Sequence, residues 1–130
     1  MRLPLYLRWS RSYRDGLRHH RKGEHDLAER DLLEAVRAAR RMHPRDDRLG
    51  CSLHALARLR QLRGDLGAAG RLYRRALAAE TDALGPQHPF TTEIARAYAG
   101  LLGQCARARA LPAARSRPGR VVQPAVIAQP

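Results

Sequence analysis

The sequence predicts an all-α fold, an antiparallel helix-hairpin array (an α-solenoid) with about two and a half repeats and five helices. Three observations support this prediction. Small and apolar residues recur at spacings of three and four, the period of a helix with one buried face. Aromatic residues make up only 5% of the chain, which suits closely packed Leu- and Ala-rich helices better than β-sheets. The pattern of residues 23–36 returns 41 residues further along, which is typical of a repeat protein.

The 130 residues are 44% hydrophobic, enough for one domain with a modest core. The formal net charge is +13, from 25 basic and 12 acidic residues, and Lys22 is the one lysine. An acidic or phosphate-bearing partner is one interpretation of this excess. The arginines are spread over every predicted helix, however, which favours a compositional origin such as the codon bias of a GC-rich genome.

The two cysteines, Cys51 and Cys105, lie far apart, and neither has a CxxC neighbour. This spacing indicates neither a zinc site nor a disulfide framework, so we expect free thiols and neither metal nor cofactor. Pro4 and Arg8 interrupt the apolar residues near the N-terminus, which end at Trp9. That segment is too short and too charged for a signal peptide or a membrane span. A cytoplasmic location without membrane contact is therefore expected.

The first half of the chain contains two predicted helices. Residues 1–7 are expected to be an N-terminal lead-in, because Pro4 disfavours helix before it. A helix follows over residues 8–22 and ends at Gly23. The next helix, residues 25–42, is clearly amphipathic and stops at His43–Pro44.

The second half begins with a hairpin of two helices, residues 48–63 and 66–84, joined at Gly64–Asp65. Asp46 or Asp47 is expected to cap the first of them. Gly85 suits the left-handed residue that ends the second helix, and Pro86 prevents continuation.

A fifth helix is predicted to start after a cap at Thr91 or Thr92, to weaken near residue 103 and to stop at Pro112. The helical repeat domain therefore spans residues 8–110. Residues 111–130 are rich in arginine and proline, contain no acidic residue and are expected to form a disordered tail.

The repeat itself becomes visible when Gly23 is placed over Gly64. Small residues then coincide where paired helices approach closely, as at Ala28 and Ala69, and bulky residues coincide at Leu32 and Tyr73. The residues that define the repeat are Gly16, Ala28, Leu32, Ala35, Leu53, Leu56, Ala57, Gly64, Ala69, Tyr73, Ala76, Leu77, Tyr98 and Ala99.

Residues 53–91 match the run LxxLAxxxxxxG…A…YxxALxxxxxxLGPxHPxT nearly throughout. This stretch resembles the tetratricopeptide repeat (TPR) family, in the longer-period variety found in kinesin light chains and many bacterial signalling proteins. The likeness is weaker over residues 19–42, and only the first helix of a third unit fits. The resemblance implies a right-handed stack in which the first helix of each unit lines a concave face that binds peptides or partner proteins.

Transferred by position, the family's concave face includes Tyr13, Leu17, His20, Cys51, His54, Arg58, Gln61, Glu93 and Arg96. Of these, His54, Arg58 and Arg96 would suit a carboxylate or an acidic peptide, because guanidinium groups pair with carboxylates through two hydrogen bonds. The alternative is a solvated helix face that binds nothing specific.

Other chemistry has little support. His20 and His25 are five residues apart, which is not the spacing of a helical zinc pair. Gly64, Gly67 and Gly70 follow a helix and precede no Lys-Ser/Thr pair, so they do not form a phosphate loop. No nucleophile or acid–base pair stands in a recognisable setting, and we expect no enzyme activity.

The expected function is protein–protein interaction, as a scaffold that binds a protein or peptide. One alternative is a basic helical protein that binds nucleic acid or another polyanion through Arg58, Arg60, Arg63, Arg71, Arg74, Arg75 and the tail. Another is a truncated remnant of a larger TPR signalling or regulatory protein. Because the array ends in half a unit, self-association through its exposed end is also expected.

Overall fold

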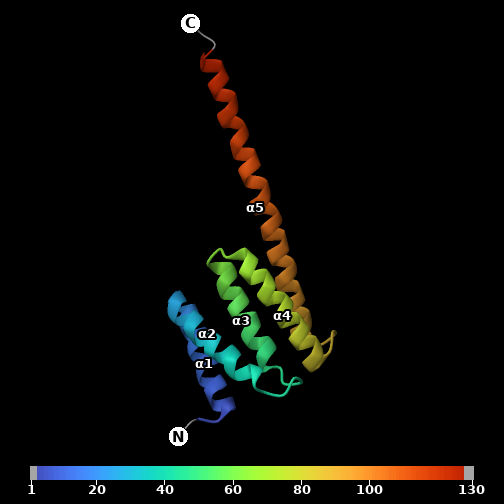
Figure 1. The fold of residues 1–130 in the computed structure, drawn as a ribbon. Helices are drawn as coiled ribbons and strands as arrows, with labels where there is room; N and C mark the ends of the chain where they lie inside the picture. Colours follow the sequence, from blue (N-terminus) through green and yellow to red (C-terminus); the bar gives the residue numbers. More distant parts are fainter. Residues whose placement is uncertain (1–2, 128–130) are drawn as a thin grey trace.

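The computed structural model describes residues 3–127, and it describes side chains for residues 3–111. This part of the chain contains helices and no strand, which confirms the predicted all-α class. The helices are α1 (Leu5–Arg21), α2 (His25–Arg40), α3 (Arg48–Leu62), α4 (Leu66–Leu84) and α5 (Pro89–Ile127). Each helix packs antiparallel against the next one along the chain, and the far end of α5 projects away from the bundle (Figure 1).

A glycine with a positive φ angle lies in three of the four connections between the described helices; the connection between α2 and α3 has none. Gly23 between α1 and α2 has φ 77°, and Gly64 between α3 and α4 has φ 87°. Both angles lie in the left-handed region that only glycine adopts at low cost. Gly85, with φ 93°, ends α4 as the sequence predicted. The two hairpins therefore turn through the same backbone conformation, as expected for repeated units.

The helix ends differ from the predicted ends in several places. Helix α1 begins at Leu5, inside the expected lead-in, because Pro4 precedes the first turn and its missing N–H would have no partner there. Helix α5 begins at Pro89, so the predicted cap at Thr91 or Thr92 is wrong: both threonines lie inside the first turn, where the N–H of Thr92 already bonds to the carbonyl of His88. Asp47 makes no side-chain cap for α3; Asp46 instead accepts the N–H of Arg48 at 2.9 Å.

Helix α5 does not end at Pro112, where the sequence predicted a stop, but continues to Ile127. A proline removes one hydrogen bond and disfavours an interior helical position by about 3 kcal/mol, yet it does not forbid helix on both sides. The predicted weakening near residue 103 is also not observed, because α5 passes that point as a single helix. The assignment of residues 111–130 to a disordered tail stays a prediction, and residues 128–130 lie outside the described residues.

The small residues of the repeat lie in the core. Ala28, Ala35, Ala57, Ala69 and Ala76 have no exposed surface. The contact between α1 and α2 is equally close, because a Cβ added at Gly16 would lie 2.8 Å from the Leu32 side chain. The larger repeat residues that are also buried in this core are Leu32, Leu53, Leu56 and Tyr73, with Leu77 and Tyr98 packed at its edge.

Ala99 is different from the other small residues of the repeat. It corresponds to the fully buried Ala57, but it is exposed on α5. The expectation that a small residue there admits a paired helix is therefore not met, because no helix of the described residues follows on that side of α5.

Polar contacts fix the units relative to one another. Trp9 of α1 stacks on Tyr13 and donates its indole N–H to Ser52 of α3 at 2.7 Å. Arg60 of α3 forms a 2.9 Å ion pair with Glu29 of α2. Within the described residues, no helix combines the length and the hydropathy needed to cross a bilayer.

Candidate functional site

The candidate site is a groove between α1, α3 and α5. It consists of two adjoining pockets, of about 360 Å³ and 250 Å³, that share Arg58 of α3. We call it the Arg58 groove. The larger pocket is lined by His20, Arg58, Gln61, Leu62 and Gln104. The smaller pocket is lined by Tyr13, Cys51, His54, Arg58, Glu80, Phe90, Glu93 and Ile94.

The structure brings together most of the residues that the sequence placed on a concave face. Tyr13, His20, His54, Arg58 and Gln61 all line the groove. They come from the first helix of two successive units, and Glu93 comes from the first helix of a third.

Two predicted face residues line neither pocket of the groove. Leu17 is half-buried and packs against the core, because it lies on the side of α1 that faces the other helices. Arg96 is exposed on α5, one turn beyond Glu93. A carboxylate clamp of His54, Arg58 and Arg96 therefore has two of its three members at the groove.

Arg58 is the arginine that lines both pockets of the groove. It is exposed and takes part in none of the ion pairs or side-chain hydrogen bonds formed among residues 3–111. Burial, together with the positive charge of Arg58, lowers the pKa of His54 and of His20 below the ordinary histidine value. Both imidazoles are therefore neutral at pH 7, and Arg58 is the cation that the groove offers to a ligand.

Gln61 is held by internal hydrogen bonds. Its side-chain amide donates to the Gln104 oxygen at 2.8 Å, and its own oxygen accepts the Tyr73 hydroxyl at 2.7 Å. These bonds tie α3 to α4 and α5 at one end of the groove. Gln61 therefore lines the groove as a fixed side chain and holds α3 against the neighbouring helices.

A buried acid, Glu80 of α4, is among the residues that line the smaller pocket. The residue has no exposed surface, and neither carboxylate oxygen has a hydrogen-bond partner among the described residues. Burial, with a smaller contribution from the Asp47 charge, raises the pKa of Glu80 to about 7. Glu80 reaches α3 where Gly50 has no side chain, because a Cβ at Gly50 would collide with the carboxylate.

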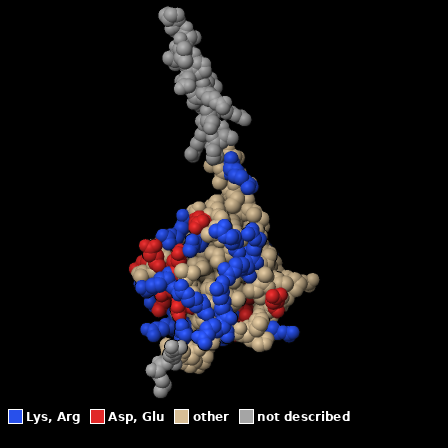
Figure 2. Space-filling view, viewed as in Figure 1, with Lys and Arg blue, Asp and Glu red and all other residues tan. Residues whose placement is uncertain are grey.

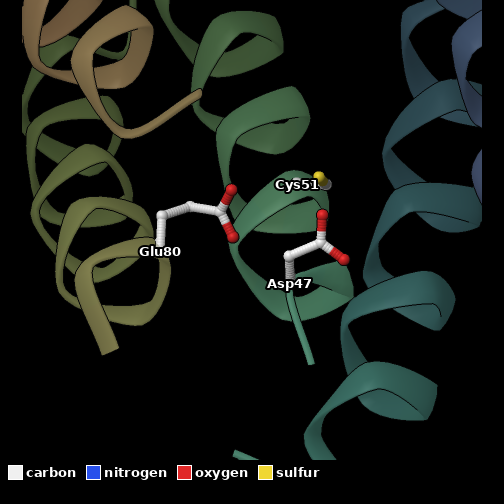
Figure 3. A group of neighbouring side chains, drawn as sticks. All are labelled: Asp47, Cys51 and Glu80. Carbon is white, nitrogen blue, oxygen red and sulfur yellow. The ribbon is translucent and has the colours of Figure 1, made fainter. Parts of the chain in front are cut away.

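Two residues at the start of α3, Asp47 and Cys51, lie next to the Glu80 carboxylate (Figure 3). The ligand atoms of Asp47, Cys51 and Glu80 all lie within 4.8 Å of one another. Burial, followed by the charges of Glu80 and Asp47, raises the pKa of the Cys51 thiol to about 12. The thiol is therefore protonated at neutral pH and is a poor nucleophile in this state.

Glu80 and Asp47 were not among the predicted site residues. One signal for Glu80 is present in the sequence, because Ala69, Tyr73, Ala76 and Glu80 follow one another at steps of three and four along the buried face of α4. An acidic residue in an otherwise apolar stripe is unusual and marks a special position. No comparable signal shows that Asp47 would lie beside it.

No family model matches this chain, and neither the curated proteins nor the solved structures contain a significant match to it. The structure itself shows the class of protein: an all-α array of helical hairpins with a polar groove along the first helix of each unit.

Proposed function

We propose that this protein is a non-enzymatic interaction module of the TPR type, which holds an acidic segment of a peptide or partner protein in the Arg58 groove. The observation that carries the proposal is the position of Arg58. Its guanidinium is shared by both pockets of the groove and is exposed there, without an internal ion pair among residues 3–111.

The chemistry of the groove favours a carboxylate. A guanidinium presents its N–H groups in a planar fork that matches a carboxylate, and such charge-assisted hydrogen bonds are the strong ones. His20 and His54 are neutral at pH 7 and offer hydrogen bonds without adding charge. Pockets of about 360 Å³ and 250 Å³ suit single side chains of an extended peptide.

The packing of the units supports the TPR assignment. The resemblance requires close helix contacts at the small repeat positions, and Ala28, Ala57 and Ala69 are fully buried there. Leu32 and Tyr73, which coincide in the repeat, are both buried. The groove is lined by α1, α3 and α5, which are the helices that such an array turns toward its ligand.

Binding is a better interpretation than catalysis. Cys51 is the one thiol at the groove, and burial keeps it protonated. Neither His20 nor His54 makes a side-chain hydrogen bond to a hydroxyl, thiol or carboxylate within residues 3–111. A nucleophile–base pair, the usual geometric requirement of nucleophilic catalysis, is therefore absent from the described part of the groove.

A display library of short peptides with graded acidic content, followed by fluorescence anisotropy on the selected sequences, tests the proposal. We expect saturable binding of acidic peptides and a loss of at least about tenfold in affinity for Arg58→Ala, the low end for a charge-assisted pair. Arg71→Ala is the matched control, because Arg71 is equally exposed on α4 but lies outside the groove. Equal binding by the two variants would contradict the role of Arg58.

Polyanion binding is a second candidate, favoured by the distribution of charge. Figure 2 shows a band of basic side chains across the middle of one face, with acidic side chains on either side of it. Arg40 and Arg75 lie close enough for the charge of Arg40 to help lower the pKa of Arg75, after the larger effect of burial. Such crowding of like charges favours an anion.

Two of the arginines assigned to that alternative are already occupied. Arg60 pairs with Glu29 and Asp65, and Arg63 pairs with Asp26 and Glu29. The salt dependence of binding distinguishes the candidates, because a ligand that covers several phosphates loses affinity steeply as salt rises. RNA or DNA binding whose affinity falls steeply with salt near physiological ionic strength would favour the polyanion over the peptide.

A further inference from the structure

The corner formed by Asp47, Cys51 and Glu80 contains two carboxylates and a thiol from two different helices. Asp47 and Cys51 lie one turn apart at the start of α3, and Glu80 extends toward them from α4 (Figure 3). Their ligand atoms are mutually within 4.8 Å. Asp47 does not use its side chain to cap α3, so its carboxylate is available in this corner.

Glu80 indicates that the corner is built for a ligand. Its side chain is fully buried, and both oxygens lack a hydrogen-bond partner among the described residues. An unpaired buried carboxylate is strongly unfavourable unless it takes up a proton or a cation or hydrogen-bond donor compensates it. Gly50 leaves the space that this side chain occupies, and the carboxylate adjoins the smaller pocket of the groove.

We propose that Asp47, Cys51 and Glu80 bind one divalent transition-metal ion of the zinc class. Thiolate ligands select zinc-like ions, whereas magnesium and calcium take oxygen ligands. Bonds of about 2.0–2.3 Å to a four-coordinate ion would bring the ligand atoms to roughly 3.5 Å from one another, within reach of side-chain rotation from the present separation. Three protein ligands leave one position for water or another donor.

The smaller pocket gives the ion a path to this corner, and binding would change the protonation of its side chains. Cys51 and Glu80 both line the smaller pocket, so the ion can reach them through it. On binding, the Cys51 Sγ–H bond breaks, the sulfur keeps the electron pair and bonds the ion, and the proton goes to solvent. Any proton on Glu80 leaves in the same way. The ion thus neutralises acidic groups whose burial, and to a smaller extent mutual repulsion, now raises the pKa values of Glu80 and Cys51.

The spacing of cysteine and histidine residues in the sequence gives no sign of this site. Asp47 and Cys51 are four positions apart in the sequence, but Glu80 is contributed by the next helix. The proposal does not depend on peptide binding in the Arg58 groove, and it is tested separately.

Titration of the full-length, chelator-treated protein with Co²⁺ tests the site. We expect one equivalent to bind and to produce a thiolate-to-cobalt charge-transfer band in the near ultraviolet, which Zn²⁺ then abolishes by displacement. Cys51→Ser should remove that band. Glu80→Gln should weaken binding by at least about tenfold, the lower end of what even an outer partner of a metal site contributes.

Cys105→Ser is the matched control, because Cys105 is a second half-buried free cysteine remote from the corner. It should retain the charge-transfer band in full. The circular dichroism of each variant verifies folding; Glu80→Gln removes a buried charge and should leave the helices intact. Absence of the band, its loss in Cys105→Ser, or cobalt bound without any thiolate signal would overturn the proposal.

Discussion

The Glu80 carboxylate of α4 occupies the space that Gly50 leaves open on α3, and any Cβ at residue 50 would collide with it. Both residues are buried at the boundary between the two helices of the central hairpin. This single contact combines a tight helix approach with a buried acid.

The first prediction concerns Gly50. Gly50→Ala should destabilise the protein by about 1–3 kcal/mol, because overpacking displaces the Glu80 side chain. Alanine has the higher helix propensity, so any loss comes from the collision. Urea unfolding measures the change. Gly100→Ala in α5 is the control: nothing lies within 4 Å of the new Cβ, and this variant should be more stable than the natural protein. A similar gain in stability from both substitutions would contradict the contact between residue 50 and Glu80.

The second prediction concerns pH. Glu80 has a folded-state pKa of about 7 against an ordinary value of 4.5, so the folded state holds the proton more tightly than the unfolded state. Stability should therefore fall as pH rises from about 4.5 to about 7, by about 3 kcal/mol for this group, and level off above that range. Urea unfolding with a chelator present should show this fall, and Glu80→Gln should lack it. Parallel pH curves for the two proteins would refute the assignment.

The third prediction compares two equivalent positions of the repeat. Ala57 is fully buried between helices, whereas its counterpart Ala99 is exposed on α5. Ala57→Glu should destabilise the fold by several kcal/mol, because it buries a charge in a close helix contact. Ala99→Glu should change stability by less than about 0.5 kcal/mol. Thermal melting followed by circular dichroism measures both. A large loss for Ala99→Glu would show that another segment covers α5.

The fourth prediction tests the electrostatics of the Arg58 groove without a ligand. The charge of Arg58 helps to lower the pKa of His20 and of His54, after the larger effect of burial. Removal of that charge in Arg58→Ala should raise both histidine pKa values, as measured by NMR titration of the imidazole protons. Arg71→Ala, outside the groove, should leave them where they are. Unchanged histidine pKa values in Arg58→Ala would show that the Arg58 guanidinium does not lie near these two imidazoles.

The fifth prediction concerns the exposed end of the array. Leu102 is 51% exposed on α5, on a helix that no second helix of a third unit covers among the described residues. Repeat arrays generally need a polar terminal surface for solubility. We expect concentration-dependent self-association in sedimentation experiments and its reduction by Leu102→Glu. A strictly monomeric protein at high concentration would contradict this expectation.

The helices, their order and the turn residues were predictable from the sequence because each depends on neighbours only a few positions away. The spacing of Ala69, Tyr73 and Ala76 defines the buried face of α4, and Gly64 marks the turn before it. Helix ends were less predictable. Pro112, Pro118 and Pro124 each disfavour helix locally, yet α5 runs through all three to Ile127.

The sequence by itself determined an all-α array with small residues at its helix contacts, and it placed Arg58 and His54 on a shared face. Only the tertiary structure decided that Arg96 lies outside the groove and that Glu80 meets Asp47 and Cys51. The physical reason is distance along the chain. Residues on one helix are related by the fixed 3.6-residue turn, whereas residues on different helices meet only where packing and helix length bring them together. Glu80 lies in an apolar stripe by local periodicity, and the open space at Gly50 of α3 makes that position possible.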